Sequence, residues 1–193
     1  MEKAMNICVY CSSSDAVAPV YFRAAEELGE IMARREDTLV YGGAGVGLMG
    51  ALARSVNANG GRVIGIMPES IAAHDIGFES ADEMIIAASL RERKRMMEEK
   101  ADVFIALPGG FGTLEELFEI LTLKQLGRHE KPIAILNING FYDPLVNLFN
   151  HIYNERFAKS ETAGIYSVCA TVSESMEYID TYSAPRLTRK WYR

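Results

Sequence analysis

The sequence predicts an α/β fold: a doubly wound, mostly parallel sheet with helices on both faces, in a single domain. Short apolar runs, typical of buried strands, alternate along the chain with longer stretches of helical periodicity. Glycine-rich turns join two of these strands to the helices that follow them. In such folds ligands bind at the carboxyl ends of the strands, where the strand order reverses.

The expected strands are short and apolar, and several end at turn residues such as Pro68. They are residues 5–11, 38–41, 62–67, 83–87, 103–107, 132–136 and 166–168. Between the third and fourth of them, residues 69–82 show no clear period. We therefore expect a loop over the sheet edge in that interval.

The expected helices carry apolar residues at helical spacing, and their ends show typical start and stop signals. Pro19 stands where the first helix can begin, and Gly60 with Gly61 ends the second. The helices are residues 20–35, 47–59, 89–101, 113–126, 143–157 and 173–182. Strands and helices thus alternate, which implies right-handed crossovers between parallel strands.

Composition and charge narrow the possible partners and compartment. A chain of 193 residues, 49% of them hydrophobic, can bury one core, so we expect one domain over residues 1–182 and a basic tail over residues 183–193. The net charge is −6 although the tail is cationic, so the acidic body disfavours nucleic-acid binding. No targeting signal or membrane-length apolar run is visible, which predicts a cytoplasmic protein without membrane contact.

The cysteines and histidines do not suggest a redox or metal site. Cys8 and Cys11 form a CxxC, but in the expected strand they face opposite sides of the sheet, whereas a redox CxxC opens a helix. We expect these thiols to be buried and idle, in a reducing compartment. The three histidines, His74, His129 and His151, have no metal-ligand spacing, so no metal is predicted.

The most informative stretch is residues 106–119, which read ALPGGFGTLEELFE. A buried strand runs into a turn with three glycines at residues 109–112 and then into a helix. This arrangement directs free backbone N–H groups and the positive helix end at an anion such as a phosphate. Thr113 and Glu116 also fit a capping box, which would explain both residues without any ligand. A plain cap needs only one turn residue, however, and glycines let a ligand approach the backbone.

A second glycine cluster occupies residues 42–50 and contains a literal GxGxxG. It follows the second expected strand, whereas a dinucleotide fingerprint usually follows the first. We favour contact with a phosphate or ribose over the alternative that these glycines serve only tight helix–sheet packing, and we disfavour a nicotinamide cofactor.

One arginine lies on the apolar side of its helix. In the helix at residues 89–101, the apolar stripe contains Leu90 and Met97, and Arg93 falls beside it while Lys94 falls at its other edge. A guanidinium directed inward needs an anionic partner, unless its stem packs while its head reaches water. The next strand ends in the glycine turn and its carboxylates, so we favour a functional anion as the partner.

In these motifs the chain resembles the LOG family, the cytokinin riboside 5′-monophosphate phosphoribohydrolases. The matching motifs are PGGFGTLEE at residues 108–116, Arg93-Lys94, YGGAGVGLMG at residues 41–50 and VYCSSS at residues 9–14. Related proteins have been labelled lysine decarboxylases, but no residue pattern here indicates a pyridoxal phosphate site. The departures include Ala44 in place of a common glycine, and Leu90-Arg91-Glu92 where Met-His-Glu is usual.

The resemblance implies a Rossmann-like α/β fold and a homodimer without metal or organic cofactor. It also implies an enzyme that hydrolyses the N-glycosidic bond of nucleoside 5′-monophosphates, AMP or N6-modified AMP, to free base and ribose 5-phosphate. The family's catalytic pair falls on Arg93 and Glu116. Glu116 would stabilise the oxocarbenium-like state of the ribose, orient water or attack C1′ itself. Arg93 would orient Glu116 and favour its ionised form, or contact the substrate. The expected substrate-binding residues are Ser13, Gly43, Asp75, Lys94, Gly109, Gly110, Phe111, Gly112, Thr113, Leu114, Glu115 and Thr122. The alternative is a nonenzymatic Rossmann-like module that binds or senses nucleotides.

Overall fold

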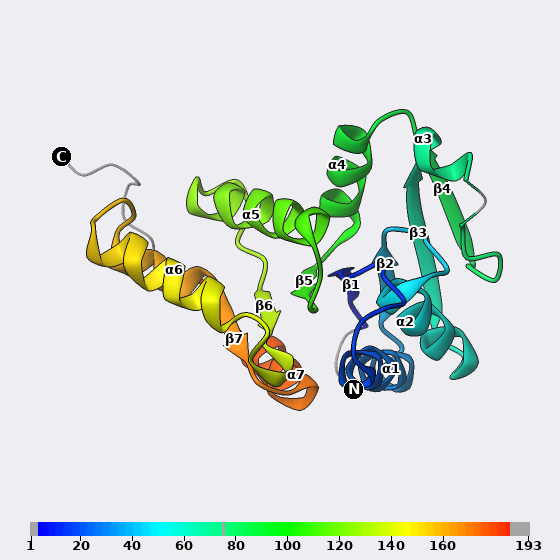
Figure 1. The fold of residues 1–193 in the computed structure, drawn as a ribbon, viewed down its shortest axis with the longest axis horizontal. Helices are drawn as coiled ribbons and strands as arrows, with labels where there is room; N and C mark the ends of the chain where they lie inside the picture. The colour runs from blue at the N-terminus through cyan, green and yellow to red at the C-terminus, as the bar shows by residue number, and fades with distance from the viewer. Residues whose placement is uncertain (1–3, 75, 186–193) are drawn as a thin grey trace.

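The described strands form one parallel seven-stranded sheet in the order β4-β3-β2-β1-β5-β6-β7 (Figure 1). The structure is a computed structural model that describes residues 4–74 and 76–185. The strands are β1 (Asn6–Tyr10), β2 (Thr38–Tyr41), β3 (Arg62–Pro68), β4 (Glu83–Ala87), β5 (Val103–Ala106), β6 (Ile133–Leu136) and β7 (Ser167–Cys169). The predicted Rossmann-like α/β fold is confirmed.

Helices cover both faces of this sheet and build two hydrophobic cores. The helices are α1 (Pro19–Arg34), α2 (Gly47–Ala58), α3 (Glu69–Ala72), α4 (Leu90–Lys100), α5 (Phe111–Gln125), α6 (Asp143–Asn154) and α7 (Val172–Asp180), with 3-10 turns at Ile138–Gly140 and Ser160–Ile165. Buried side chains of α1, α2 and α7 pack on one face. Those of α4, α5 and α6 pack on the other, so the apolar runs of the strands are buried on both sides.

The strand order reverses between β1 and β5. The chain adds β2, β3 and β4 on one side of β1 and then returns to pair β5 with its other side. Val9 pairs with Tyr41, and Tyr10 pairs with Ala106, so the carboxyl ends of these three strands lie at one edge. The segments after them therefore meet there, as the sequence predicts for a ligand site.

Two local predictions need correction. Residues 69–82 are not entirely loop, because α3 forms one short helix after Pro68. The helix predicted to begin at Thr113 begins at Phe111, with Gly110 as its N-cap in an extended conformation and no capping side chain. Thr113 is therefore the third residue of the helix rather than its cap, and the capping box does not form.

The predicted burial of Cys8 and Cys11 is confirmed. Cys8 and Cys11 are buried and free, and they belong to the cores on opposite faces of the sheet. Burial raises the pKa of the Cys8 thiol to about 12, so the reactive thiolate is disfavoured at neutral pH. Burial likewise raises the pKa of the Cys11 thiol well above its ordinary value.

Two further findings concern the part of the chain that the structure describes. None of its helices combines the length and the apolar character that crossing a bilayer requires. Asp75 and residues 186–193, which include most of the predicted basic tail, lie outside the described residues. The predicted substrate contact of Asp75 and the predicted basic tail therefore stay predictions.

Candidate active site

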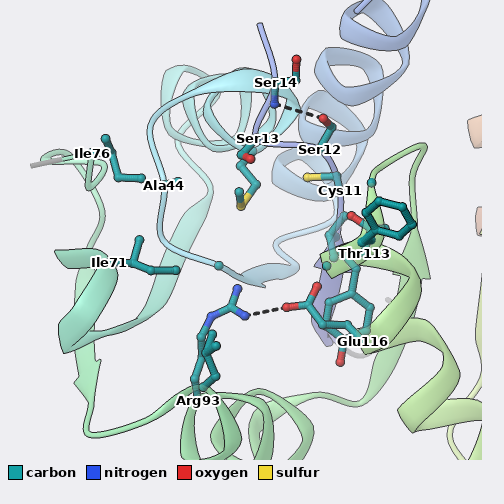
Figure 2. A pocket seen from close by; sticks show the side chains of 18 residues that line it. Cys11, Ser12, Ser13, Ser14, Ala44, Ile71, Ile76, Arg93, Thr113 and Glu116 are labelled. Atoms are coloured by element: carbon teal, nitrogen blue, oxygen red, sulfur yellow. Dashed lines mark hydrogen bonds and ion pairs between the residues drawn. The ribbon is translucent and has the colours of Figure 1, made fainter. Parts of the chain in front are cut away.

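A cavity of about 440 Å³ opens at the carboxyl ends of β1, β2 and β5, at the reversal of strand order. Its wall combines backbone from three glycine- or serine-rich turns with a few charged and apolar side chains. The lining residues are Val9, Tyr10, Cys11, Ser12, Ser13, Ser14, Gly42, Ala44, Met49, Ile71, Ile76, Leu90, Arg93, Gly110, Phe111, Gly112, Thr113 and Glu116. In Figure 2, Arg93 and Glu116 face each other across the lower part of this cavity.

Arg93 comes from the first turn of α4 and reaches across the end of the sheet. Ser89 caps this helix by accepting from the Glu92 backbone N–H at 3.2 Å, which fixes where its first turn begins. Arg93 Nε donates to the Ile66 carbonyl oxygen at 2.9 Å, and Nη1 donates to Glu116 Oε1 at 2.5 Å. The anionic partner predicted for the inward guanidinium is therefore Glu116.

Glu116 lies in the second turn of α5 and is 8% exposed. Burial raises the pKa of its carboxyl above the ordinary 4.5, while the Arg93 guanidinium acts in the opposite direction. The net direction is upward, so burial outweighs the ion pair. A carboxyl group with a perturbed pKa in a cavity is typical of functional sites.

The N-terminus of α5 offers unpaired backbone donors to the cavity. The first hydrogen bond of this helix runs from the Leu114 N–H to the Gly110 carbonyl oxygen, at 3.1 Å. The N–H groups of Phe111, Gly112 and Thr113 precede it and have no acceptor one turn back in the helix. Together with the helix dipole, they make the cavity attractive to an anion.

The glycines of this turn have different reasons for being glycine. A Cβ on Gly109 would lie 2.1 Å from Thr113 Oγ1, so Gly109 is required by packing inside the turn. A Cβ on Gly110 or Gly112 would meet nothing within 4 Å, although both line the cavity. Protein packing therefore does not explain why residues 110 and 112 are glycines.

Serines and apolar side chains form the other walls. Ser12, Ser13 and Ser14 follow β1, and the Ser14 N–H donates to Ser12 Oγ at 3.0 Å. Ile71 and Ile76 lie on the side of the cavity opposite Glu116 (Figure 2). The cavity thus has a polar side near the helix end and an apolar side across from it.

The structure brings part of the predicted site together. Of the predicted residues, those that line the cavity are Ser13, Arg93, Gly110, Phe111, Gly112, Thr113 and Glu116. Those that do not line it are Gly43, Lys94, Gly109, Leu114, Glu115 and Thr122. Lys94 instead pairs with Glu115 and, at 2.8 Å, with Glu119, which ties α4 to α5.

Sequence reasoning missed several lining residues. Gly42 lines the cavity while the predicted Gly43 does not; Gly43 has a φ of 82° and its missing side chain faces methionines. Ser12 and Ser14 could have been found, because they follow the strand at the reversal point. Ile71 and Ile76 carried no local signal, because they lie in the segment read as an aperiodic loop.

Metal-ligating side chains are dispersed in the described part of the chain. Across residues 4–74 and 76–185, no three His, Cys, Asp or Glu residues are grouped so that they could hold a metal ion.

The fold and the cavity define a class: a Rossmann-like protein with an open helix N-terminus and a buried Arg–Glu pair at its reversal point. The sequence model of a family described as "Possible lysine decarboxylase" matches residues 49–179. A probable cytokinin riboside 5′-monophosphate phosphoribohydrolase of Oryza sativa subsp. japonica is 39% identical over 178 residues, which cover 92% of this chain and 73% of the relative. A cytokinin riboside 5′-monophosphate phosphoribohydrolase of Arabidopsis thaliana is 40% identical over 177 residues, covering 92% and 83%. The chain belongs to this family, the LOG family.

Solved structures agree on the fold. A molybdenum cofactor binding protein of Rippkaea orientalis superimposes with a TM-score of 0.71 over 94% of this chain and 98% of its own, at 22% identity. The molybdenum cofactor carrier protein of Chlamydomonas reinhardtii gives 0.70 over 92% and 97%, also at 22% identity. At such identity the likeness concerns the fold alone.

Proposed function

We propose that the protein is an N-glycosyl hydrolase that cleaves nucleoside 5′-monophosphates to free base and ribose 5-phosphate. The observation that carries this proposal is the buried pair of Arg93 and Glu116 in a cavity that also receives the open N-terminus of α5. The names of its relatives point to cytokinin riboside 5′-monophosphates as the substrate class.

The chemistry follows from the charges in the cavity. The N–H groups of residues 111–113 bind the 5′-phosphate, and Glu116, one helical turn beyond Thr113, faces the ribose. Breaking the ribosyl C–N bond develops positive charge on the sugar, and the carboxylate stabilises that charge more strongly in the transition state than in the bound substrate. Arg93 fixes the carboxylate in place and favours its ionised form.

The apolar side of the cavity suits the base. Ile71 and Ile76 offer no hydrogen-bonding groups in their side chains, so an adenine with an apolar N6 substituent fits this side better than a charged or strongly polar base.

The proposal is tested by incubating purified protein with a panel of nucleoside monophosphates, nucleosides and triphosphates and measuring free base. Monophosphates are expected to react fastest, with N6-alkylated AMP at or above AMP. Nucleosides cleaved as fast as monophosphates would contradict phosphate binding at α5. Binding of a monophosphate without base release would favour the nonenzymatic module.

We also propose that the working unit is a homodimer in the cytoplasm, formed by a single domain over residues 1–182. Large apolar side chains such as Phe111, Phe118 and Leu126 of the α5 region and Phe157 after α6 are exposed. Burial against a second copy would remove them from water. Analytical ultracentrifugation that finds a monomer at micromolar concentration would overturn this assembly.

The pH dependence of turnover should report the ionisation of the Glu116 carboxyl group. If the ionised carboxylate is required, kcat/KM should fall on the acid side with a midpoint above 4.5, because burial raises the pKa of this group. The measurement is base release from a monophosphate between pH 4 and pH 8, with buffers matched in ionic strength. A midpoint at or below 4.5 would mean that a different group controls the acid limb.

Gly112 and Gly109 form a matched pair that separates ligand contact from packing. Gly112→Ala should leave the free energy of unfolding unchanged or raise it by up to about 1 kcal/mol, because alanine favours the helix and its Cβ would meet no other atom. The same substitution should raise KM for monophosphates about tenfold or more, because the methyl group would crowd the bound phosphate. Gly109→Ala should lower the melting temperature instead, because its Cβ would overlap Thr113. Thermal melts and KM for both variants check this. An unchanged KM in Gly112→Ala would contradict the proposal that the phosphate binds at this turn.

A further inference from the structure

Gly42, the residue directly after β2, lies against the guanidinium of Arg93. A Cβ built on residue 42 would lie 2.4 Å from Arg93 Nη2 and 2.9 Å from Met49 Sδ. Both distances are well inside van der Waals contact, so no other residue fits there while Arg93 holds its present position.

The backbone at this position does not itself require glycine. Among the described residues, the glycines with positive φ are Gly43, Gly47, Gly60, Gly127 and Gly140, and Gly42 is not one of them. The φ of Gly42 therefore lies outside the left-handed region that favours glycine. What excludes a side chain at residue 42 is therefore the space that Arg93 and Met49 occupy.

We propose that Gly42 is a positioning residue for Arg93: the missing side chain lets the guanidinium seat where it can hold Glu116. This inference rests on the roles proposed above for Arg93 and Glu116. The guanidinium is planar and rigid, so Nε, Nη1 and Nη2 move as one unit. A methyl group that displaces Nη2 must also disturb the bond from Nε to Ile66 O, at 2.9 Å, or the bond from Nη1 to Glu116 Oε1, at 2.5 Å.

Gly42→Ala should fold, because the atoms in its way are the tips of two flexible side chains. Its effect should appear in turnover: kcat falls roughly 10–100-fold, as a displacement of about 1 Å in a catalytic group allows, while KM changes little. The acid limb of the pH profile should move upward, because the guanidinium that favours ionised Glu116 has moved away. Gly77→Ala is the matched control, because Gly77 has no positive φ and its Cβ would meet nothing within 4 Å.

A double-mutant cycle separates positioning from obstruction of the substrate. In an Arg93→Lys background the Nη2 atom is absent, so adding Gly42→Ala should cost little further kcat. Strong coupling of this kind, with Gly77→Ala unchanged, supports the proposal. A rise in KM, or the same loss of activity in both backgrounds, would mean that the methyl group blocks the substrate directly and would overturn it.

A crystal structure of Gly42→Ala tests the same point without any assay. Arg93 Nη1 should no longer lie within hydrogen-bond distance of Glu116 Oε1. If the wild type released no base, the proposed function would fail, yet this structure would still decide the role of Gly42. An Arg93–Glu116 pair unchanged in the variant would refute the inference, whatever the activity.

Discussion

Replacing Glu116 with glutamine is expected to lower kcat by about 10²–10³, or roughly 3–4 kcal/mol of transition-state stabilisation, as the loss of one preorganised electrostatic group typically does. The glutamine keeps the size of the side chain and an oxygen that can accept from Arg93 Nη1. It removes only the negative charge that the developing cation on the ribose requires. The measurement is single-turnover base release from a nucleoside monophosphate.

The stability of Glu116→Gln should stay close to that of the wild type. The substitution removes the cost of a charged carboxylate in a buried place, but it leaves the Arg93 guanidinium without a counter-charge, and the two effects oppose each other. Glu119→Gln is the control: it removes the same charge from the same helix at a half-exposed site outside the cavity. Turnover should stay within about twofold in the control. Base release at the wild-type rate in Glu116→Gln would refute the role assigned to this carboxylate.

Arg93→Ala is expected to lower both turnover and stability. The Arg93 and Glu116 side chains are 12% and 10% exposed, so removing the arginine leaves an almost buried carboxylate unpaired, which typically costs roughly 3–5 kcal/mol. Turnover should fall by at least about 10², because Glu116 loses the contact that orients it. Arg93→Lys keeps the positive charge but loses the planar guanidinium, so its turnover and stability should lie between those of the wild type and Arg93→Ala.

The pH dependence of the stability loss identifies its cause. Without Arg93, the pKa of the Glu116 carboxyl in the folded protein rises further above its value in the unfolded chain, because burial then acts unopposed. A group whose folded pKa is raised favours folding while it is protonated and loses that contribution as pH rises through the folded pKa. The difference in melting temperature between wild type and Arg93→Ala should therefore be small near pH 4 and larger at pH 8.

Arg95→Ala provides the control for this series. Arg95 lies on the same helix and pairs with Glu99 at 2.5 Å, but both side chains are more than half exposed. Its removal should cost less than about 1 kcal/mol and leave base release unchanged. A stability loss in Arg93→Ala that matched this control at every pH would show that the Arg93–Glu116 pair is not effectively buried.

Local sequence was ambiguous where one residue type serves two purposes. Thr113 and Glu116 satisfy the spacing of a capping box, and nothing within the helix excludes it. The structure resolves this ambiguity, because the Glu116 carboxylate accepts a hydrogen bond from Arg93, which is remote in sequence. The three glycines of the turn were equally ambiguous. Gly109 is required because a side chain there would overlap Thr113, whereas Gly110 and Gly112 face open space.

The sequence by itself determined the fold class, and it pointed to Arg93, Glu116 and the glycine turn before α5 as parts of one site. Apolar segments that alternate with amphipathic ones favour a parallel sheet covered on both faces, and an arginine on the apolar side of α4 favoured an anionic partner. The tertiary structure alone decided that Gly42, rather than Gly43, faces the cavity, and that Ile71 and Ile76 form its apolar wall. Those outcomes depend on how strands and loops distant in sequence approach one another, and spacing along a single chain does not encode that distance.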